Sequence, residues 1–273
     1  MTSLAFAFGL LAGSFLNVCI HRWPREQSVI SPRSRCTKCS AGIAWYDNIP
    51  LLSYVLLLGR CRQCSQVIAR RYPLVEFLTA STYALVAATH GFGLEAARAA
   101  LLASMLIVLF FTDLEHMKLP DQVTISGIVA GITFSLLVPL PSGVADVGFL
   151  VVGGHPPAWL LSLTESLAGA ILFGGILYLI GEAYYRIRGI DGLGRGDVKL
   201  VAMVAAFLGT SEALLVLLLG CLLATLVGSV SVAVKRAGWR TPLPFGSYLS
   251  GAALVTIFAG DAILNRYWEF VLG

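Results

Sequence analysis

The sequence predicts an all-α, polytopic integral membrane protein with about eight transmembrane helices and a small cysteine-rich segment outside the bilayer. The chain of 273 residues is 57% hydrophobic and 12% charged, and its mean hydropathy is +0.82. Apolar runs approach the ~20 residues that a helix needs to cross a bilayer. We place them at Leu4 to Ile20, Pro73 to His90, Ala97 to Thr112, Val123 to Leu140, Trp159 to Ala183, Val198 to Leu208, Ala213 to Val234 and Ser247 to Leu264.

The distribution of basic residues predicts the orientation. The first apolar run has no Lys or Arg before it, whereas His21, Arg22 and Arg25 follow it, which is the reverse of a cleavable signal peptide. With eight spans, only Arg98 and Arg266 of the 19 Lys and Arg residues fall outside the cell. The positive-inside rule then gives a periplasmic N-terminus. The pI of 8.8 follows from this bias, so it is not evidence for a nucleic-acid partner.

The polar segment after the first span contains four of the six cysteines. They form two C-x2-C pairs, Cys36 with Cys39 and Cys61 with Cys64. Two intervening residues let both thiolates of a pair reach one tetrahedral ion, so the spacing predicts a structural zinc site. The predicted cytoplasmic location disfavours disulfides, and reduced or redox-active thiols are the alternative. Bound metal would support folding of a segment with little core of its own.

These features divide the chain into a first transmembrane helix (1–20), a cytoplasmic zinc-knuckle-like segment (21–72) and a transmembrane part (73–273). Inside the second division, residues 43–60 are apolar but are interrupted by Asn48-Ile49-Pro50. We interpret them as an apolar hairpin or a helix on the membrane surface. Residues 141–158 are predicted to form an external loop with a short apolar middle.

A second motif is Gly194-Arg195-Gly196-Asp197, which leads into an apolar run. A carboxylate at the mouth of an apolar helix is costly unless it is functional. Asp113 ends an earlier run, and the predicted topology brings both carboxylates to the same cytoplasmic surface. Taken singly, each is most simply a helix cap.

A close pair of carboxylates has different chemistry, because repulsion and desolvation raise one pKa and the pair shares a proton. This is the arrangement of aspartic proteolysis, in which one group accepts a proton from water while the other polarises the scissile carbonyl. Gly194 and Gly196 would leave room for an extended substrate backbone, and we group Lys199 with them as support for the pair. The spacing of these glycines does not fit a dinucleotide fingerprint.

Taken together, these motifs resemble those of the bacterial type IV prepilin peptidases, membrane aspartic proteases of the G-x-G-D class. The resemblance covers most of residues 9 to 260. Its peptidase motifs are Asp113 followed by Leu119-Pro120-Asp121, and Gly194-Arg195-Gly196-Asp197-Val198-Lys199-Leu200. Its N-terminal motifs are Gly13-Ser14-Phe15-Leu16-Asn17-Val18, Ser31-Pro32, the four cysteines, Asn48-Ile49-Pro50, Gly59-Arg60-Cys61 and Arg71-Tyr72-Pro73-Leu74-Val75-Glu76.

The resemblance implies a bifunctional enzyme of the bacterial inner membrane. It would remove the basic leader of type IV prepilins and type II secretion pseudopilins, and then methylate the new N-terminal residue with S-adenosylmethionine. Asp113 and Asp197 would be the catalytic dyad. No S-adenosylmethionine fingerprint is present, so the methyl-donor site is assigned only to residues 21–72. Glu76 is interpreted as a carboxylate stabilised by a helix N-terminus, or else as a contact for a charged substrate or cofactor.

Three alternatives remain open. A transporter would also use intramembrane carboxylates, but it would place them near the midplane on interrupted helices. A membrane-anchored zinc module that only binds a partner would explain the cysteines but not the glycine-flanked aspartate. A preflagellin peptidase would share the aspartates but not the N-terminal cysteine region.

Overall fold

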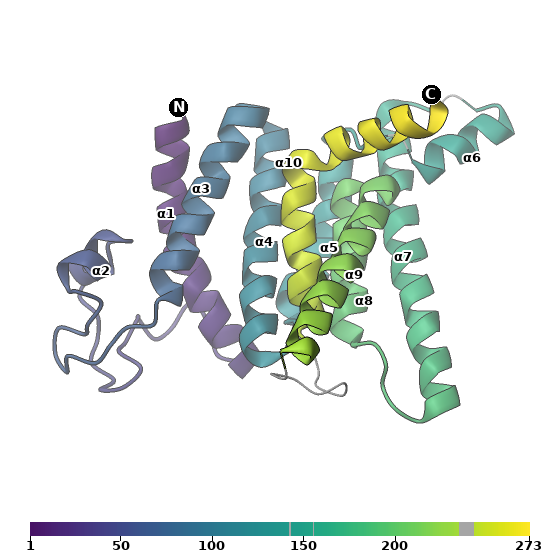
Figure 1. Ribbon diagram of the computed structural model, residues 1–273. Helices are drawn as coiled ribbons and strands as arrows, with labels where there is room; N and C mark the ends of the chain where they lie inside the picture. Colours follow the sequence, from purple (N-terminus) through teal and green to yellow (C-terminus); the bar gives the residue numbers. More distant parts are fainter. Residues whose placement is uncertain (142, 155, 235–242) are drawn as a thin grey trace. The chain divides into compact units, whose positions relative to one another are not determined.

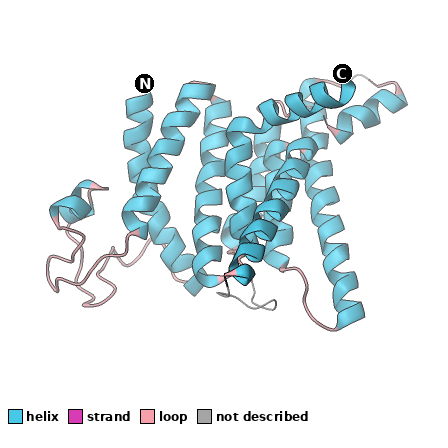
Figure 2. Cartoon of the chain, viewed as in Figure 1, coloured by secondary structure: helices cyan, strands magenta, loops and turns pink. Residues whose placement is uncertain are grey.

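The computed structural model describes residues 1–141, 143–154, 156–234 and 243–273, and it is helical throughout, as predicted (Figures 1 and 2). No strand occurs among the described residues, although Arg35 with Gly42 and Arg60 with Val67 form isolated β-bridges. The helices of the N-terminal part are α1 (Thr2–Arg22), η1 (Trp23–Arg25), η2 (Trp45–Asn48), α2 (Leu52–Leu56), α3 (Arg71–His90) and α4 (Leu94–His116). Those of the C-terminal part are α5 (Asp121–Ser135), α6 (Val144–Val152), α7 (Ala158–Arg188), α8 (Arg195–Leu208), α9 (Thr210–Ala233) and α10 (Phe245–Leu272).

The predicted number of transmembrane helices was wrong. Five helices of the described chain, α1, α4, α7, α9 and α10, are long and apolar enough to cross a bilayer. The helices α5 and α8 have only 15 and 14 residues. At 1.5 Å per residue they span about 21 to 23 Å, which is short of the ~30 Å hydrocarbon core. The helix α3 has 20 residues, but Glu76 and several Thr and Ser residues lower its hydropathy.

Two other segments differ in detail from their predicted form. The apolar residues 43–60 contain only the short helices η2 and α2, and the predicted external loop at 141–158 contains α6. The basic residues Lys235, Arg236 and Arg240 lie outside the described residues.

The chain forms two compact units, Met1–Val108 and Leu109–Gly273, and α4 contributes to both. In the first unit, α1 packs against α3. Gly9 and Gly13 make this approach close, because a Cβ atom at Gly9 would lie 2.6 Å from the Cα atom of Ala80 and one at Gly13 would lie 2.7 Å from that of Glu76. Small residues spaced by four let two helix backbones meet in this way.

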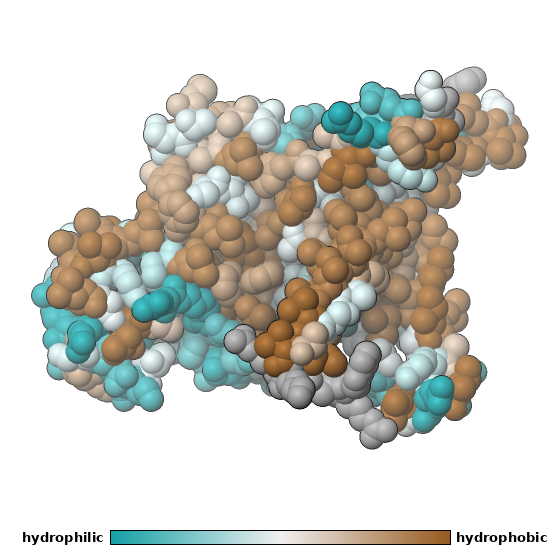
Figure 3. Space-filling model, viewed as in Figure 1, coloured by the Kyte–Doolittle hydropathy of each residue, from teal (hydrophilic) through white to brown (hydrophobic). Residues whose placement is uncertain are grey.

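The second unit is built around α8. Every residue from Leu200 to Leu208 is buried, because α5, α7, α9 and α10 all pack against α8. A helix that is apolar on all sides is stable only in such surroundings. The outward faces of α7 and α9 are apolar instead of polar (Figure 3), with exposed Ile171, Leu179, Leu218 and Leu222. Lipid is the solvent that such faces suit, in agreement with a polytopic membrane protein.

Candidate active site

Asp113 lies near the C-terminal end of α4 and is only 6% exposed. Its Oδ2 atom accepts a hydrogen bond from the backbone N–H of Ser247 at 2.7 Å, and it lies 3.1 Å from the Ser247 hydroxyl. The same hydroxyl lies 2.9 Å from the carbonyl oxygen of Phe110. Because a serine hydroxyl has one proton, it donates to one of these acceptors at a time. The carboxylate is therefore held in a fixed orientation by the first turn of α10.

Asp197 lies in the first turn of α8, outside the five candidate spans, and is half-buried. The residue before the helix is Gly194, whose carbonyl accepts the backbone N–H of Asp197 at 3.1 Å. A Cβ atom at Gly194 would lie 2.9 Å from Oδ2 of Asp197, and one at Gly196 would lie 3.0 Å from the Cβ of Leu119. A larger residue at either position would therefore displace the side chain of Asp197 or Leu119.

The N-terminal turn of α10 brings the two carboxylates together. Ser247 donates to Asp113, and a Cβ atom at the preceding residue, Gly246, would lie 3.1 Å from Oδ1 of Asp197. Free N–H groups and the helix dipole make a helix N-terminus favourable for negative charge. The two aspartates, which are 84 positions apart in the sequence, therefore share one small site.

The electrostatics of this site perturb Asp197. Burial is the largest effect and the negative charge of Asp113 is the second, and together they raise the pKa of Asp197 to about 7, although the backbone N–H of Gly194 acts in the opposite direction. A carboxyl group with this pKa holds or releases a proton near neutral pH. That property suits a general acid or base.

The remaining predicted residue of this group, Lys199, faces a different partner. Its Nζ atom lies 2.6 Å from Oδ1 of Asp121 at the start of α5, so the ion pair ties α8 to α5. Its support of the aspartates stays a prediction.

Sequence reasoning missed Gly246 and Ser247. The prediction began a span at Ser247 but gave it no role. The available signal was a Gly-Ser pair at the mouth of an apolar helix, predicted to lie on the same side of the membrane as the two aspartates. Nothing in the local pattern indicates that Ser247 bonds to a residue 134 positions away.

The four predicted metal ligands do come together in the first unit. The Sγ atoms of Cys36, Cys39, Cys61 and Cys64 all lie within 4.8 Å of one another, and those of Cys36 and Cys64 are 3.8 Å apart. Tetrahedral zinc with Zn–S bonds of about 2.3 Å requires an S–S separation of about 3.8 Å. The donor set and its spacing therefore fit zinc.

The two cysteine pairs lie in two copies of the same turn. In each copy, the N–H of the first cysteine donates to a carbonyl five residues later, Ala41 in the first copy and Gln66 in the second, at 2.9 Å. The serine after each second cysteine has a positive φ angle, 57° at Ser40 and 55° at Ser65. Backbone N–H groups, first that of Cys39 and then that of Lys38, lower the pKa of the Cys36 thiol to about 6, which favours the thiolate that metals bind.

These two features define a polytopic membrane protein with a carboxylate pair and a four-cysteine cluster. The family model described as "Bacterial Peptidase A24 N-terminal domain" matches residues 7–90, and the one described as "Type IV leader peptidase family" matches residues 100–229. The chain belongs to the type IV leader peptidase family, which confirms the resemblance found in the sequence.

The similar curated relatives are named prepilin leader peptidase/N-methyltransferase. The relative from Aeromonas salmonicida is 35% identical over an alignment of 295 positions, which covers 99% of this chain and 94% of the relative. The one from Aeromonas hydrophila is 36% identical, covering 97% of this chain and 93% of the relative. The one from Pseudomonas aeruginosa is 31% identical, covering 96% and 91%. No solved structure matched significantly.

Proposed function

We propose that this protein removes the leader peptide of prepilins and pseudopilins and then methylates the new N-terminal amine. The observation that carries the peptidase part is the pair of carboxylates, Asp113 and Asp197, at one helix N-terminus. Relatives of nearly the same length are named for both activities, which supports the assignment.

For the cleavage step, we assign Asp113 and Asp197 as a dyad that shares one proton. Asp197, whose pKa is raised to about 7, carries the proton and donates a hydrogen bond to the scissile carbonyl. Asp113, oriented by Ser247, accepts a proton from the attacking water. The water oxygen bonds to the carbonyl carbon, the C–N bond breaks, and the departing amine receives a proton from the dyad.

For the second step, we assign methyl transfer to residues 21–72, with S-adenosylmethionine as the donor. The lone pair of the neutral pilin amine bonds to the methyl carbon, and the methyl–sulfur bond breaks with its electrons left on sulfur. The amine then loses one proton. The peptidase function belongs to residues 73–273 in this division.

The cysteine cluster is proposed to hold a structural zinc ion through Cys36, Cys39, Cys61 and Cys64. Four thiolates leave no open coordination position, so the ion would stabilise the fold of residues 21–72 and take no part in either reaction.

We place the protein in the bacterial inner membrane, with the aspartates and the cysteine segment on the cytoplasmic side. The basic residues around the cysteine segment, including Arg22, Arg25, Arg33 and Arg35, support this orientation through the positive-inside rule. Prepilins inserted with the leader in the cytoplasm would then present the scissile bond at that side.

The proposal is tested by incubating the detergent-solubilised protein with a prepilin and labelled S-adenosylmethionine. The mass of the product is then measured by mass spectrometry. We expect a mature chain one methyl group heavier than the cleaved peptide. The double variant Asp113→Asn/Asp197→Asn should leave the prepilin uncut. A cut product from that variant would refute the dyad, and an unmethylated product from the wild type would refute the second activity.

A further inference from the structure

A large cavity in the first unit has no assigned role. It measures about 890 Å³, within the range of small-molecule sites, and is enclosed by the ends of α1 and α3 and by the loops between them. The residues that enclose it run from Ser14 to Glu76 and include polar, charged and aromatic side chains. All of them lie in the unit Met1–Val108, whereas both aspartates belong to the unit Leu109–Gly273.

The cavity contains an unsatisfied hydrogen-bond acceptor at Asn17, a side chain that is only 2% exposed. Both amide hydrogens of Asn17 are used, because Nδ2 lies 3.3 Å from the carbonyl oxygen of Gly13 and 3.0 Å from that of Tyr72. The Oδ1 atom has no partner among the described residues. A buried acceptor without a donor is costly, which is the signature of a missing N–H or O–H group.

A buried carboxylate lies on the facing helix. Glu76 is 8% exposed and lines the same cavity. Its Oε2 atom accepts the backbone N–H of Leu51 at 2.8 Å, and Ser14 also hydrogen-bonds to the carboxylate. A carboxylate accepts about four hydrogen bonds, so capacity remains. Burial raises the pKa of the Glu76 carboxyl group, against hydrogen bonds from Leu51 and Ser14 that lower it. No ion pair to Glu76 is found within the described part of the chain, so a cation from outside would favour its ionised form.

Close helix packing fixes these two groups relative to each other. Gly13 lies one turn before Asn17 on α1 and meets the backbone of Glu76 itself. The acceptor and the carboxylate are therefore presented by rigid elements and not by loops, which is typical of a preorganised binding site.

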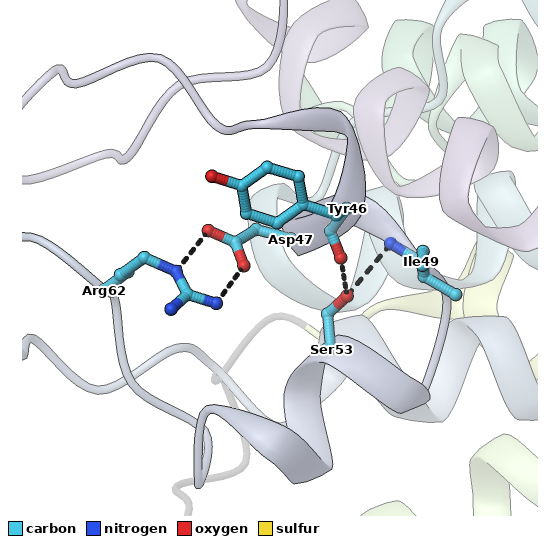
Figure 4. Close-up of polar contacts among 5 residues, drawn as sticks. All are labelled: Tyr46, Asp47, Ile49, Ser53 and Arg62. Atoms are coloured by element: carbon cyan, nitrogen blue, oxygen red, sulfur yellow. Dashed lines mark hydrogen bonds and ion pairs between the residues drawn. The ribbon is translucent and has the colours of Figure 1, made fainter.

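The loop wall of the cavity is also held in place by polar contacts (Figure 4). Arg62 donates to both carboxylate oxygens of Asp47, at 2.8 and 2.6 Å, and its guanidinium lies over the ring of Tyr46. The Ser53 hydroxyl accepts the N–H of Ile49 at 3.0 Å and donates to the Tyr46 carbonyl at 2.9 Å. Asp47 is thus neutralised by Arg62, whereas no such ion pair is found for Glu76 among the residues that the structure describes.

The walls add positive charge and aromatic surface. Arg22, which lines the cavity, holds the loop beside it by donating to the carbonyl oxygens of Ser28 at 2.9 Å and Pro32 at 2.7 Å. Arg33 and Lys38 are further cations of the lining. The site therefore offers an acceptor and a carboxylate on the helices, cations on the loops and aromatic rings between them.

We propose that this cavity is the binding site for S-adenosylmethionine. Glu76 faces a cationic centre of the methyl donor, its sulfonium or its α-ammonium, and Asn17 Oδ1 accepts an N–H. The basic loop side chains bind the α-carboxylate, and tyrosine rings of the lining contact the adenine. This inference rests on the proposed methyl transfer and names its site. A purely anionic ligand would leave the charge of Glu76 and the acceptor of Asn17 unsatisfied.

The test measures the equilibrium binding of S-adenosylmethionine to the full-length, zinc-loaded protein in detergent. Glu76→Gln removes one charge while keeping the side-chain shape, and we expect Kd to rise about tenfold or more. Glu95→Gln is the matched control, because Glu95 is exposed in the same unit and does not line the cavity. Its Kd should be unchanged.

A second pair of variants tests the volume of the cavity. Gly42 lines the cavity, and a Cβ atom there meets nothing within 4 Å, so Gly42→Phe adds a bulky ring to the cavity lining without a backbone clash. Gly93 is equally open but lies outside the cavity, which makes Gly93→Phe its control. We expect only Gly42→Phe to abolish measurable binding. Stoichiometric zinc establishes that the first unit of each variant is folded, and retained prepilin cleavage establishes the same for the second unit.

The results separate this inference from the proposed function. If Glu76→Gln and Gly42→Phe both bind the methyl donor as tightly as the wild type does, the cavity assignment is overturned while methyl transfer stands. If the wild-type protein neither binds S-adenosylmethionine nor methylates a processed pilin, both fail together.

Discussion

The two groups of chemistry-bearing residues in this protein are held in place by different means. Asp197 stands on α8, which other helices of the second unit surround, and Asp113 is held by the first turn of α10. The four cysteines stand on two short loop turns of the first unit, where backbone hydrogen bonds supply most of the order. The peptidase site should therefore depend on helix packing, and the cysteine segment on a metal ion.

The largest effect expected from this difference is at the aspartates. Asp113→Asn or Asp197→Asn removes an ionisable group without changing its shape, and we expect prepilin cleavage to fall by about 10³-fold or more. Zinc content and methylation of an already processed pilin should be unchanged, because we propose that both depend on the first unit. Quantifying cleavage by gel and methyl transfer by mass measures the two effects separately. Substantial cleavage by either variant would contradict the assignment.

The next largest effect should come from the metal. Cys39→Ser removes one of four thiolate ligands, so we expect zinc to be lost and methyl transfer to fall by about tenfold or more as residues 21–72 lose order. Cleavage should change little. The control is Cys221→Ser, which alters an exposed cysteine of α9 outside the cluster. Equal loss of both activities in Cys39→Ser would show that the two regions are not independent.

Raising the pH should slow cleavage and accelerate methyl transfer. The pKa of Asp197 is raised to about 7, so its proton is present below that pH and lost above it. Cleavage, which uses that proton, should fall by about tenfold per pH unit well above neutrality. Methyl transfer needs the neutral pilin amine, whose pKa is about 8, and should instead rise over the same range. Rate profiles of each step from pH 5 to 9 measure this, and parallel profiles would refute the separate sites.

Sequence reasoning succeeded where a feature is local and failed where it depends on chain geometry. The C-x2-C spacing directly predicts converging thiolates, and the structure brings all four together. Composition predicts an all-helical membrane protein. The number of spans was wrong because an apolar run does not show where its helix ends. The helix α8 ends at Gly209, which has a φ angle of 91°, after only 14 residues.

The aspartate pair is another feature that depends on chain geometry and that the sequence therefore shows only in part. Their motifs single out Asp113 and Asp197, but the contacts that join them come from Gly246 and Ser247 on α10, far along the chain. The sequence likewise does not show that Asn17 and Glu76 lie together. Only the packing of α1 on α3 places an unsatisfied amide oxygen and a carboxylate in the lining of the same cavity.

The smallest expected effect tests the contact at α10. Ser247→Ala removes the hydroxyl that lies 3.1 Å from Asp113 but keeps the backbone N–H that donates at 2.7 Å. With the stronger of the two donors in place, we expect kcat for cleavage to fall by only about fivefold. KM should stay within about twofold, because orientation of Asp113 acts on the chemical step. Ser250→Ala is the control, since it changes a buried serine one turn further along α10. A loss as large as that of Asp113→Asn would mean that the hydroxyl takes part in the reaction, whereas no loss at all would leave the backbone N–H as the only positioning group.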